Sequence, residues 1–120
     1  MDVLFVCVGN TCRSQMAEAI AKNLGHKAQS GGTNPPDSGK ISENAIIVLE
    51  EIGIGTDSLF AKSVDDFKDF DFDKIVSMGC GVSCPDLPID EDWGLEDPHG
   101  KELEAYRKTR DEVIKLISRL

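Results

Sequence analysis

Basic residues and long hydrophobic runs are both scarce in this chain. Lysine and arginine together number 13, against 22 aspartates and glutamates, which gives a formal net charge of −9. Nucleic acids and anionic membrane surfaces require a basic face, so we expect neither as a partner. The N-terminal apolar run covers only residues 3–8 and follows the acidic Asp2. It is too short for a signal peptide or a membrane span, which predicts a cytoplasmic protein.

Histidine is rare as well, and cysteine occurs only four times. Without an export signal, these cysteines are better explained as catalytic, redox or metal-binding thiols than as a secreted disulfide scaffold. A chain of 120 residues is large enough to bury roughly two thirds of its unfolded surface without metals or disulfides. We therefore expect a single domain over residues 1–120, and a monomer.

The most informative segment is a short loop of small residues between a cysteine and an arginine. An apolar strand ends near Cys7, and Arg13 stands just before a helix that is expected to begin near Ser14. The backbone N–H groups of such a loop can turn inward around an anion, and the helix adds its positive end. Arg13 supplies a fork of donors for a phosphate-like group, and the same field stabilises a Cys7 thiolate. The predicted oxyanion-binding residues are Val8, Gly9, Asn10, Thr11, Cys12, Arg13 and Ser14.

Cys7 is the candidate nucleophile of this loop. Gly9 and Asn10 are expected to supply the unusual dihedral angles, and Ser14 to hydrogen-bond the Cys7 sulfur or cap the helix. A buried structural cysteine followed by an ordinary arginine is the alternative. The combination of strand, cysteine, small-residue loop, arginine and helix start favours the anion site.

Apolar spacing predicts strands and helices in alternation along the chain. Strands are expected from residue 3 up to Cys7, at 26–30 and at 74–78, and helices at 14–24, 45–52, 63–70 and 103–120. This order predicts an α/β fold with three layers, a doubly wound parallel sheet flanked by helices on both faces. Ligands bind such folds beyond the C-terminal ends of the strands, where Cys7 and Cys80 both follow a strand.

Cys80 and Cys84 form a second constellation, in a glycine-containing loop after the strand at 74–78. A redox-active dithiol is the functional interpretation, because Gly79 and Gly81 help the loop to bring the two sulfurs together. The pair could instead be inert, or half of a zinc site. His99 is the nearby candidate ligand for zinc, but no second Cys/His pair completes the site.

Asp97 stands before Pro98 in a late loop and is a candidate general acid. The proline restricts the backbone and could hold the carboxyl over the anion loop. A simple turn is the alternative, since Asp-Pro pairs are common in loops. Glu96 is the rival acid, and His99 is either a base or a solvent-facing histidine without a catalytic role.

Through Cys7, Arg13, Ser14 and the late Asp97, the chain resembles the low-molecular-weight protein tyrosine phosphatase superfamily over nearly its full length. Within that superfamily, residues 12–18, the Cys80/Cys84 pair and residues 92–94 resemble the thioredoxin-coupled arsenate reductases. Phosphatases of this fold generally carry proline where Gln15 stands. The resemblance implies a four-stranded parallel sheet and an arsenate reductase. The alternative is a protein tyrosine phosphatase that hydrolyses phosphomonoesters through a phosphocysteine.

The resemblance also implies a sequence of thiol steps. Cys7 attacks arsenate, Asp97 protonates the departing oxygen, Cys80 attacks the Cys7 sulfur as arsenite leaves, and Cys84 resolves the disulfide. We expect no bound cofactor or metal. The external reductant is a thioredoxin-like protein or a low-molecular-weight thiol, and Cys12 is expected to have a structural or oxidation-sensitive role. An oxyanion- or metal-sensing module is the non-enzymatic alternative.

Overall fold

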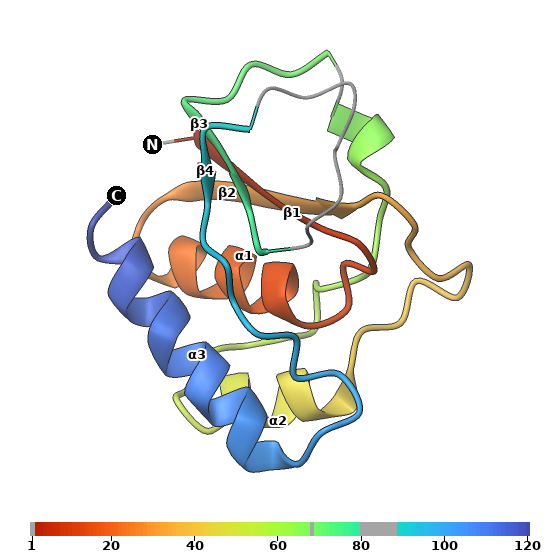
Figure 1. Ribbon diagram of the computed structural model, residues 1–120, viewed down its shortest axis with the longest axis vertical. Helices are drawn as coiled ribbons and strands as arrows, with labels where there is room; N and C mark the ends of the chain where they lie inside the picture. Colours follow the sequence, from red (N-terminus) through yellow and green to blue (C-terminus); the bar gives the residue numbers. More distant parts are fainter. Residues whose placement is uncertain (1, 68, 80–88) are drawn as a thin grey trace.

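The computed structural model describes residues 2–67, 69–79 and 89–120. In chain order, its elements are β1 (Asp2–Cys7), α1 (Arg13–Asn23), β2 (Lys27–Gly32), α2 (Glu43–Glu50), the 3₁₀ helix η1 (Val64–Phe67), β3 (Lys74–Ser77), β4 (Glu91–Asp92) and α3 (Leu103–Ile117). Figure 1 shows α3 running beside α1. No helix in the described segments has the length and apolarity needed to cross a membrane.

The four described strands form one sheet in the order β2-β1-β3-β4, and all three pairings are parallel. This confirms the predicted α/β fold class. The register aligns Cys7 at the end of β1 with Gly32 at the end of β2, and Ser77 of β3 with Asp92 of β4. The C-terminal ends of the strands therefore meet at one edge, from which the candidate loops emerge.

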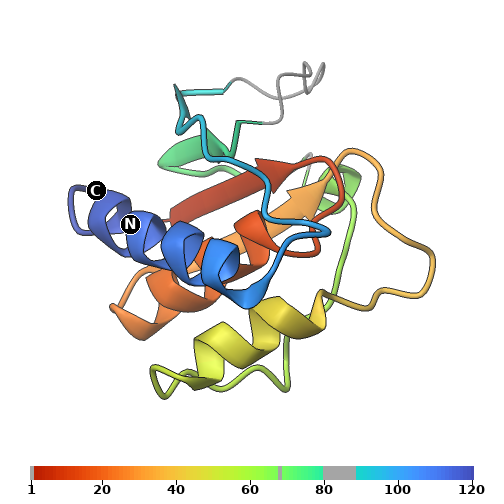
Figure 2. The same cartoon turned by 60° about the horizontal axis from the view of Figure 1, so that its bottom comes forward.

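Alternation along β1 divides the core between the two faces of the sheet. Val3, Phe5 and Cys7 belong to the cluster packed against the three α-helices, whereas Leu4 and Val6 pack with Phe67 and Ile75 on the opposite face. Figure 2 shows α1 and α3 close to the first face, with α2 beyond them. The second face is covered in part by η1 and the chain that follows it, so the helices are unequally divided between the faces.

Several predicted element boundaries are wrong by a few residues. The short helix expected to end near Phe70 is a 3₁₀ helix that ends at Phe67, and Ser63 Oγ accepts the N–H of Asp65 at its start. β3 ends at Ser77 rather than residue 78, and α3 ends at Ile117. The last strand, β4, has two exposed residues and therefore lacks the apolar pattern from which a strand could be predicted.

Candidate active site

The loop between β1 and α1 turns back on itself at Asn10, which has φ = 55°. Of the two residues expected to supply unusual dihedrals, Asn10 does so and Gly9 does not. Asparagine tolerates this left-handed conformation better than most residues. The loop rests on Gly32, where a Cβ atom would lie 2.6 Å from the Val8 carbonyl oxygen. The end of β2 thus needs a glycine to make room for the loop.

The Cys7 sulfur faces two donors inside this loop. The Asn10 N–H donates to Sγ at 3.1 Å, and the Ser14 hydroxyl lies 2.8 Å from Sγ. Asn10 Nδ2 donates to Ser14 Oγ at 2.7 Å, which leaves the hydroxyl proton of Ser14 free to point at the sulfur. Both donors stabilise a thiolate. Ser14 therefore contacts the sulfur, as expected, and α1 has no side-chain cap among the described residues.

Two residues outside the predicted oxyanion site hold Asn10 in place. Gln15 Nε2 donates to the Asn10 carbonyl and side-chain oxygens at 3.0 and 2.9 Å, and also to the Phe60 carbonyl at 2.7 Å. The backbone N–H of Lys62 donates to Asn10 Oδ1 at 2.9 Å. With its carbonyl held outward by Gln15, the peptide after Asn10 presents its N–H toward the inside of the loop.

Arg13 is 6 % exposed, and its donors divide into two sets. Nη1 donates to the carbonyl oxygens of Met78 and Leu95, at 2.7 and 3.0 Å. Nη2 lies 3.7 Å from Asp97 Oδ2, and the buried Nε has no hydrogen-bond partner among the described residues. A buried donor without a partner is costly, and an oxyanion would satisfy it. Nε and Nη2 form one edge of the guanidinium, suited to bidentate binding of an oxyanion.

Asp97 approaches the loop from the other end of the chain. Its Oδ1 accepts the His99 N–H at 3.0 Å and lies 3.5 Å from the Cys12 sulfur. Partial burial raises the pKa of Asp97, but the His99 N–H, the Arg13 charge and the Cys12 thiol outweigh it and hold that pKa below its usual value. Burial, with the nearby Asp97 charge, raises the pKa of Cys12 to about 12, so Cys12 stays protonated.

These residues line one cavity of about 510 Å³ at the C-terminal edge of the sheet. All seven residues of the predicted oxyanion site except Ser14 line it, together with Cys7, Gly79, Leu95, Asp97 and His99. Ser14 does not line the cavity itself, but its hydroxyl contacts the Cys7 sulfur, which does. Cys80 and Cys84, the predicted thiol relay, lie outside the described residues.

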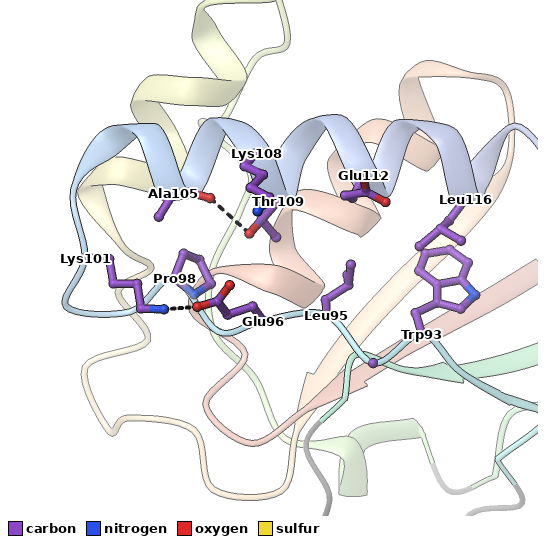
Figure 3. Close-up of a pocket in the computed structure, with 11 residues that line it drawn as sticks. Trp93, Leu95, Glu96, Pro98, Lys101, Ala105, Lys108, Thr109, Glu112 and Leu116 are labelled. Carbon is purple, nitrogen blue, oxygen red and sulfur yellow. Dashed lines mark hydrogen bonds and ion pairs between the residues drawn. The ribbon is translucent and has the colours of Figure 1, made fainter.

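The rival acid Glu96 faces a different cavity, of about 310 Å³, between the 93–98 segment and α3 (Figure 3). It forms an ion pair with Lys101 there. Trp93, Leu95 and Pro98 give this cavity an apolar floor against α3. Neighbouring residues of one segment thus face opposite sides, Asp97 toward the anion loop and Glu96 toward α3.

A buried ion-pair cluster lies behind the loop, and sequence reasoning missed it. Glu18 of α1 is 3 % exposed. Its carboxylate accepts hydrogen bonds from Lys22 Nζ at 2.8 Å, Lys62 Nζ at 3.0 Å and the Ser30 hydroxyl at 2.6 Å. Burial raises the pKa of Glu18, but these three donors outweigh it and hold the pKa below its usual value. The apolar spacing of this helix puts Glu18 on its polar face, so the sequence carried no signal of its burial. In the part of the chain that the structure describes, no group of three or more His, Cys, Asp or Glu side chains is arranged to hold a metal ion.

Comparison with known proteins identifies relatives of nearly the same length. Glutaredoxin arsenate reductase of Synechocystis sp. is 38 % identical over 98 % of this chain and 94 % of its own. A solved arsenate reductase in the phosphate-binding state superimposes with a TM-score of 0.87 at 37 % identity, covering 98 % and 94 % of the two chains. A low molecular weight protein tyrosine phosphatase from T. tengcongensis has a TM-score of 0.82 at 36 % identity, covering 99 % and 96 %.

The family profile described as low molecular weight phosphotyrosine protein phosphatase matches residues 2–83, which include the whole Cys7–Arg13 loop. The match spans more than half of the chain, and the relatives above share both its length and its fold. The chain therefore belongs to the low molecular weight phosphotyrosine protein phosphatase family.

Proposed function

We propose that this protein is an arsenate reductase that converts arsenate to arsenite. The observation that carries the proposal is that the Cys7 sulfur and Arg13 line one cavity, and that the buried Arg13 Nε has no hydrogen-bond partner among the described residues. Arsenate and phosphate share shape and charge, so this cavity alone fits both. Cys80 and Cys84 favour reduction, because a phosphatase needs only water as its second nucleophile. The similarity to proteins named arsenate reductase supports the same choice.

In the first step, Arg13 Nε and Nη2 bind two arsenate oxygens, and the loop N–H groups surround the others. The Cys7 thiolate, held by Ser14 and Asn10, attacks arsenic and forms an S–As bond. One As–O bond breaks, and arsenic stays in its oxidised state. Burial of the loop keeps the donors fixed, so little reorganisation is needed during the attack.

Asp97 supplies the proton that the departing oxygen needs. Without substrate, its pKa is held below the usual value, so the carboxyl is ionised at neutral pH. An arriving oxyanion neutralises the Arg13 charge and places negative charge near Asp97, and both effects raise the pKa of Asp97. Asp97 can then take a proton from a protonated arsenate and return it to the oxygen that leaves as water.

The thiol relay completes the reaction. The Cys80 thiolate attacks the Cys7 sulfur, two electrons pass from the sulfurs to arsenic, arsenite leaves, and a Cys7–Cys80 disulfide forms. Cys84 then attacks Cys80, which releases Cys7 as a thiolate and leaves a Cys80–Cys84 disulfide. A thioredoxin-like dithiol or a low-molecular-weight thiol reduces this disulfide. We propose a monomer that works in the reducing cytoplasm, with no bound cofactor.

The experiment that tests this function follows NADPH loss with arsenate, thioredoxin, thioredoxin reductase and the reduced protein, in parallel with hydrolysis of an aryl phosphate. A second set replaces thioredoxin with glutathione, glutaredoxin and glutathione reductase. Arsenate-dependent NADPH loss that disappears in Cys80→Ser is expected. Fast aryl phosphate hydrolysis without NADPH loss in either set would instead identify a phosphatase, the activity named for a relative with 36 % identity.

Replacing Asp97 by asparagine is expected to slow adduct formation while anion binding changes little. Asparagine has no carboxyl proton to donate, but it has nearly the same size as aspartate and can still form hydrogen bonds. We therefore expect the single-turnover rate to fall about 10²-fold or more. Rapid-quench measurement with arsenate and a phosphate binding titration separate the two effects. Glu96→Gln is the matched control, since Glu96 faces the other cavity. A normal single-turnover rate in Asp97→Asn would show that the Asp-Pro segment is a simple turn without a role in proton transfer.

A further inference from the structure

The orientation of the Arg13 fork is set by backbone carbonyls that lie far away in the sequence. A guanidinium has five N–H donors. The two on Nη1 go to the carbonyl oxygens of Met78 and Leu95, at 2.7 and 3.0 Å. The remaining donors, on Nε and Nη2, are then directed toward the cavity and Asp97. The direction of the anion-binding edge therefore depends on where those two carbonyls lie.

The two carbonyls meet at a narrow junction, formed by residues 77–79 at the end of β3 and residues 93–95 after β4. The Trp93 N–H donates to the Ser77 carbonyl at 2.9 Å, which begins the contact. At Gly79 the chains approach so closely that a Cβ atom would lie 2.8 Å from the Leu95 nitrogen and 2.9 Å from the Gly94 Cα. Gly79 also has φ = 88°, in the left-handed region. Only glycine fits this contact without displacement of backbone.

Buried contacts hold the chain in place on both sides of the junction, so neither side moves easily to make room for a side chain at position 79. Met78 is fully buried, and its N–H donates to the Val6 carbonyl at 2.9 Å. On the other side, Trp93 and Leu95 pack against the hydrophobic core, and Figure 3 shows the Leu95 side chain directed toward α3. A bulkier residue at position 79 must therefore separate the chains at the junction itself.

We propose that Gly79 is a positioning residue for the oxyanion site: its missing side chain lets the Met78 and Leu95 carbonyls converge on Arg13 Nη1 and so aims the Nε–Nη2 edge at the anion. Gly79 itself lines the cavity beside Arg13 and Leu95. The inference rests on the proposed anion-binding role of Arg13, but not on whether the bound oxyanion is reduced or hydrolysed.

The test measures the dissociation constant of inorganic phosphate by calorimetry for the reduced protein and its variants. Gly79→Ala is expected to weaken phosphate binding about tenfold, as a bidentate contact becomes misaligned. Gly53→Ala is the matched control, because Gly53 has φ = 79° but no described atom within 4 Å of the site of a Cβ. It adds similar backbone strain at the end of α2 and should leave phosphate affinity within about twofold.

A double-mutant cycle with Arg13→Lys separates positioning from a general loss of structure. Lysine has a single ammonium group whose binding does not depend on the orientation of a planar guanidinium. Adding Gly79→Ala to Arg13→Lys should therefore weaken phosphate binding by a further factor of less than about two. Equal losses in both backgrounds would overturn the inference, as would unchanged affinity in a folded Gly79→Ala protein. Circular dichroism checks the fold. If Gly79→Ala does not fold, Leu95→Ala loosens the same junction, and unchanged phosphate affinity there overturns the inference as well.

These outcomes are distinguishable from failure of the proposed function. If the wild-type protein binds phosphate but consumes no NADPH with arsenate, the reductase proposal fails while the cycle still tests Gly79. If NADPH is consumed and the cycle shows no coupling between Gly79 and Arg13, the reductase proposal stands and the positioning role fails.

Discussion

Replacing Cys7 by serine is expected to abolish arsenate reduction and aryl phosphate hydrolysis together, each by at least about 10⁴-fold. Both reactions begin with the same sulfur nucleophile, and a serine hydroxyl in this loop is far less nucleophilic than a thiolate stabilised by Asn10 and Ser14. Arg13 and the loop N–H groups are unchanged by the substitution, so phosphate should still bind. Steady-state assays and a phosphate titration on the same preparation measure the two properties.

Cys12→Ser provides the matched control within the same loop. Cys7 and Cys12 are 3 % and 5 % exposed, so burial does not distinguish them. Their hydrogen-bond partners do, because the Cys7 sulfur faces the Asn10 N–H and the Ser14 hydroxyl, whereas the Cys12 sulfur faces the Asp97 carboxylate. Burial together with this carboxylate raises the pKa of Cys12 to about 12, so Cys12 stays a thiol. We expect Cys12→Ser to keep its activity within about tenfold of the wild type. Retained turnover in Cys7→Ser, or an equally severe loss in Cys12→Ser, would contradict the assignment of the nucleophile.

The central part of this site could be predicted from the sequence because it is local. Cys7, Arg13 and Ser14 lie within one strand–loop–helix unit, where the apolar strand, the small loop residues and the helix start determine the geometry together. Parallel strands bring their C-terminal ends to one edge, which made a contact with a distant loop reasonable. Asp97 lies 85 residues from Cys12 and could be proposed only from its proline context and the family resemblance.

The supports of the loop could not be predicted, because each depends on a tertiary contact without a local pattern. Gln15 stood out in the sequence only because phosphatases of this fold carry proline there, and its contacts with Asn10 and the Phe60 carbonyl could not be anticipated. Lys62 donates its backbone N–H to the Asn10 side chain and its charged Nζ to the Glu18 carboxylate. The junction at Gly79 depends on the chain after β4, a strand too short and too exposed to leave a hydrophobic pattern. Gly79 could be read from the sequence, but its close contact with Gly94 and Leu95 could not be predicted.

Lys62→Met is expected to destabilise the protein by about 3 kcal/mol at pH 7, because it removes the more buried of the two cations that contact the buried Glu18 carboxylate. This corresponds to a fall of about 10 °C in Tm for a domain of this size. Methionine keeps the length of the lysine stem and removes the charge. Lys22→Met is the matched control, since Lys22 also contacts Glu18 but its side chain is 45 % exposed. It should cost less than about 1 kcal/mol.

The pH dependence identifies the cause of that loss. In the wild type, the pKa of folded Glu18 lies below its ordinary value of 4.5, so Glu18 contributes stability above that pH, and the contribution is lost as the pH falls through the folded pKa. In Lys62→Met, burial acts with one fewer opposing cation, and the folded pKa rises. Protonation of Glu18 then relieves the penalty, so the difference in unfolding free energy between the two proteins should shrink as the pH falls from 7 to 4. Urea denaturation at both pH values measures it. A deficit that is independent of pH, or no larger than that of Lys22→Met, would show that Lys62 acts through packing rather than by neutralising a buried carboxylate.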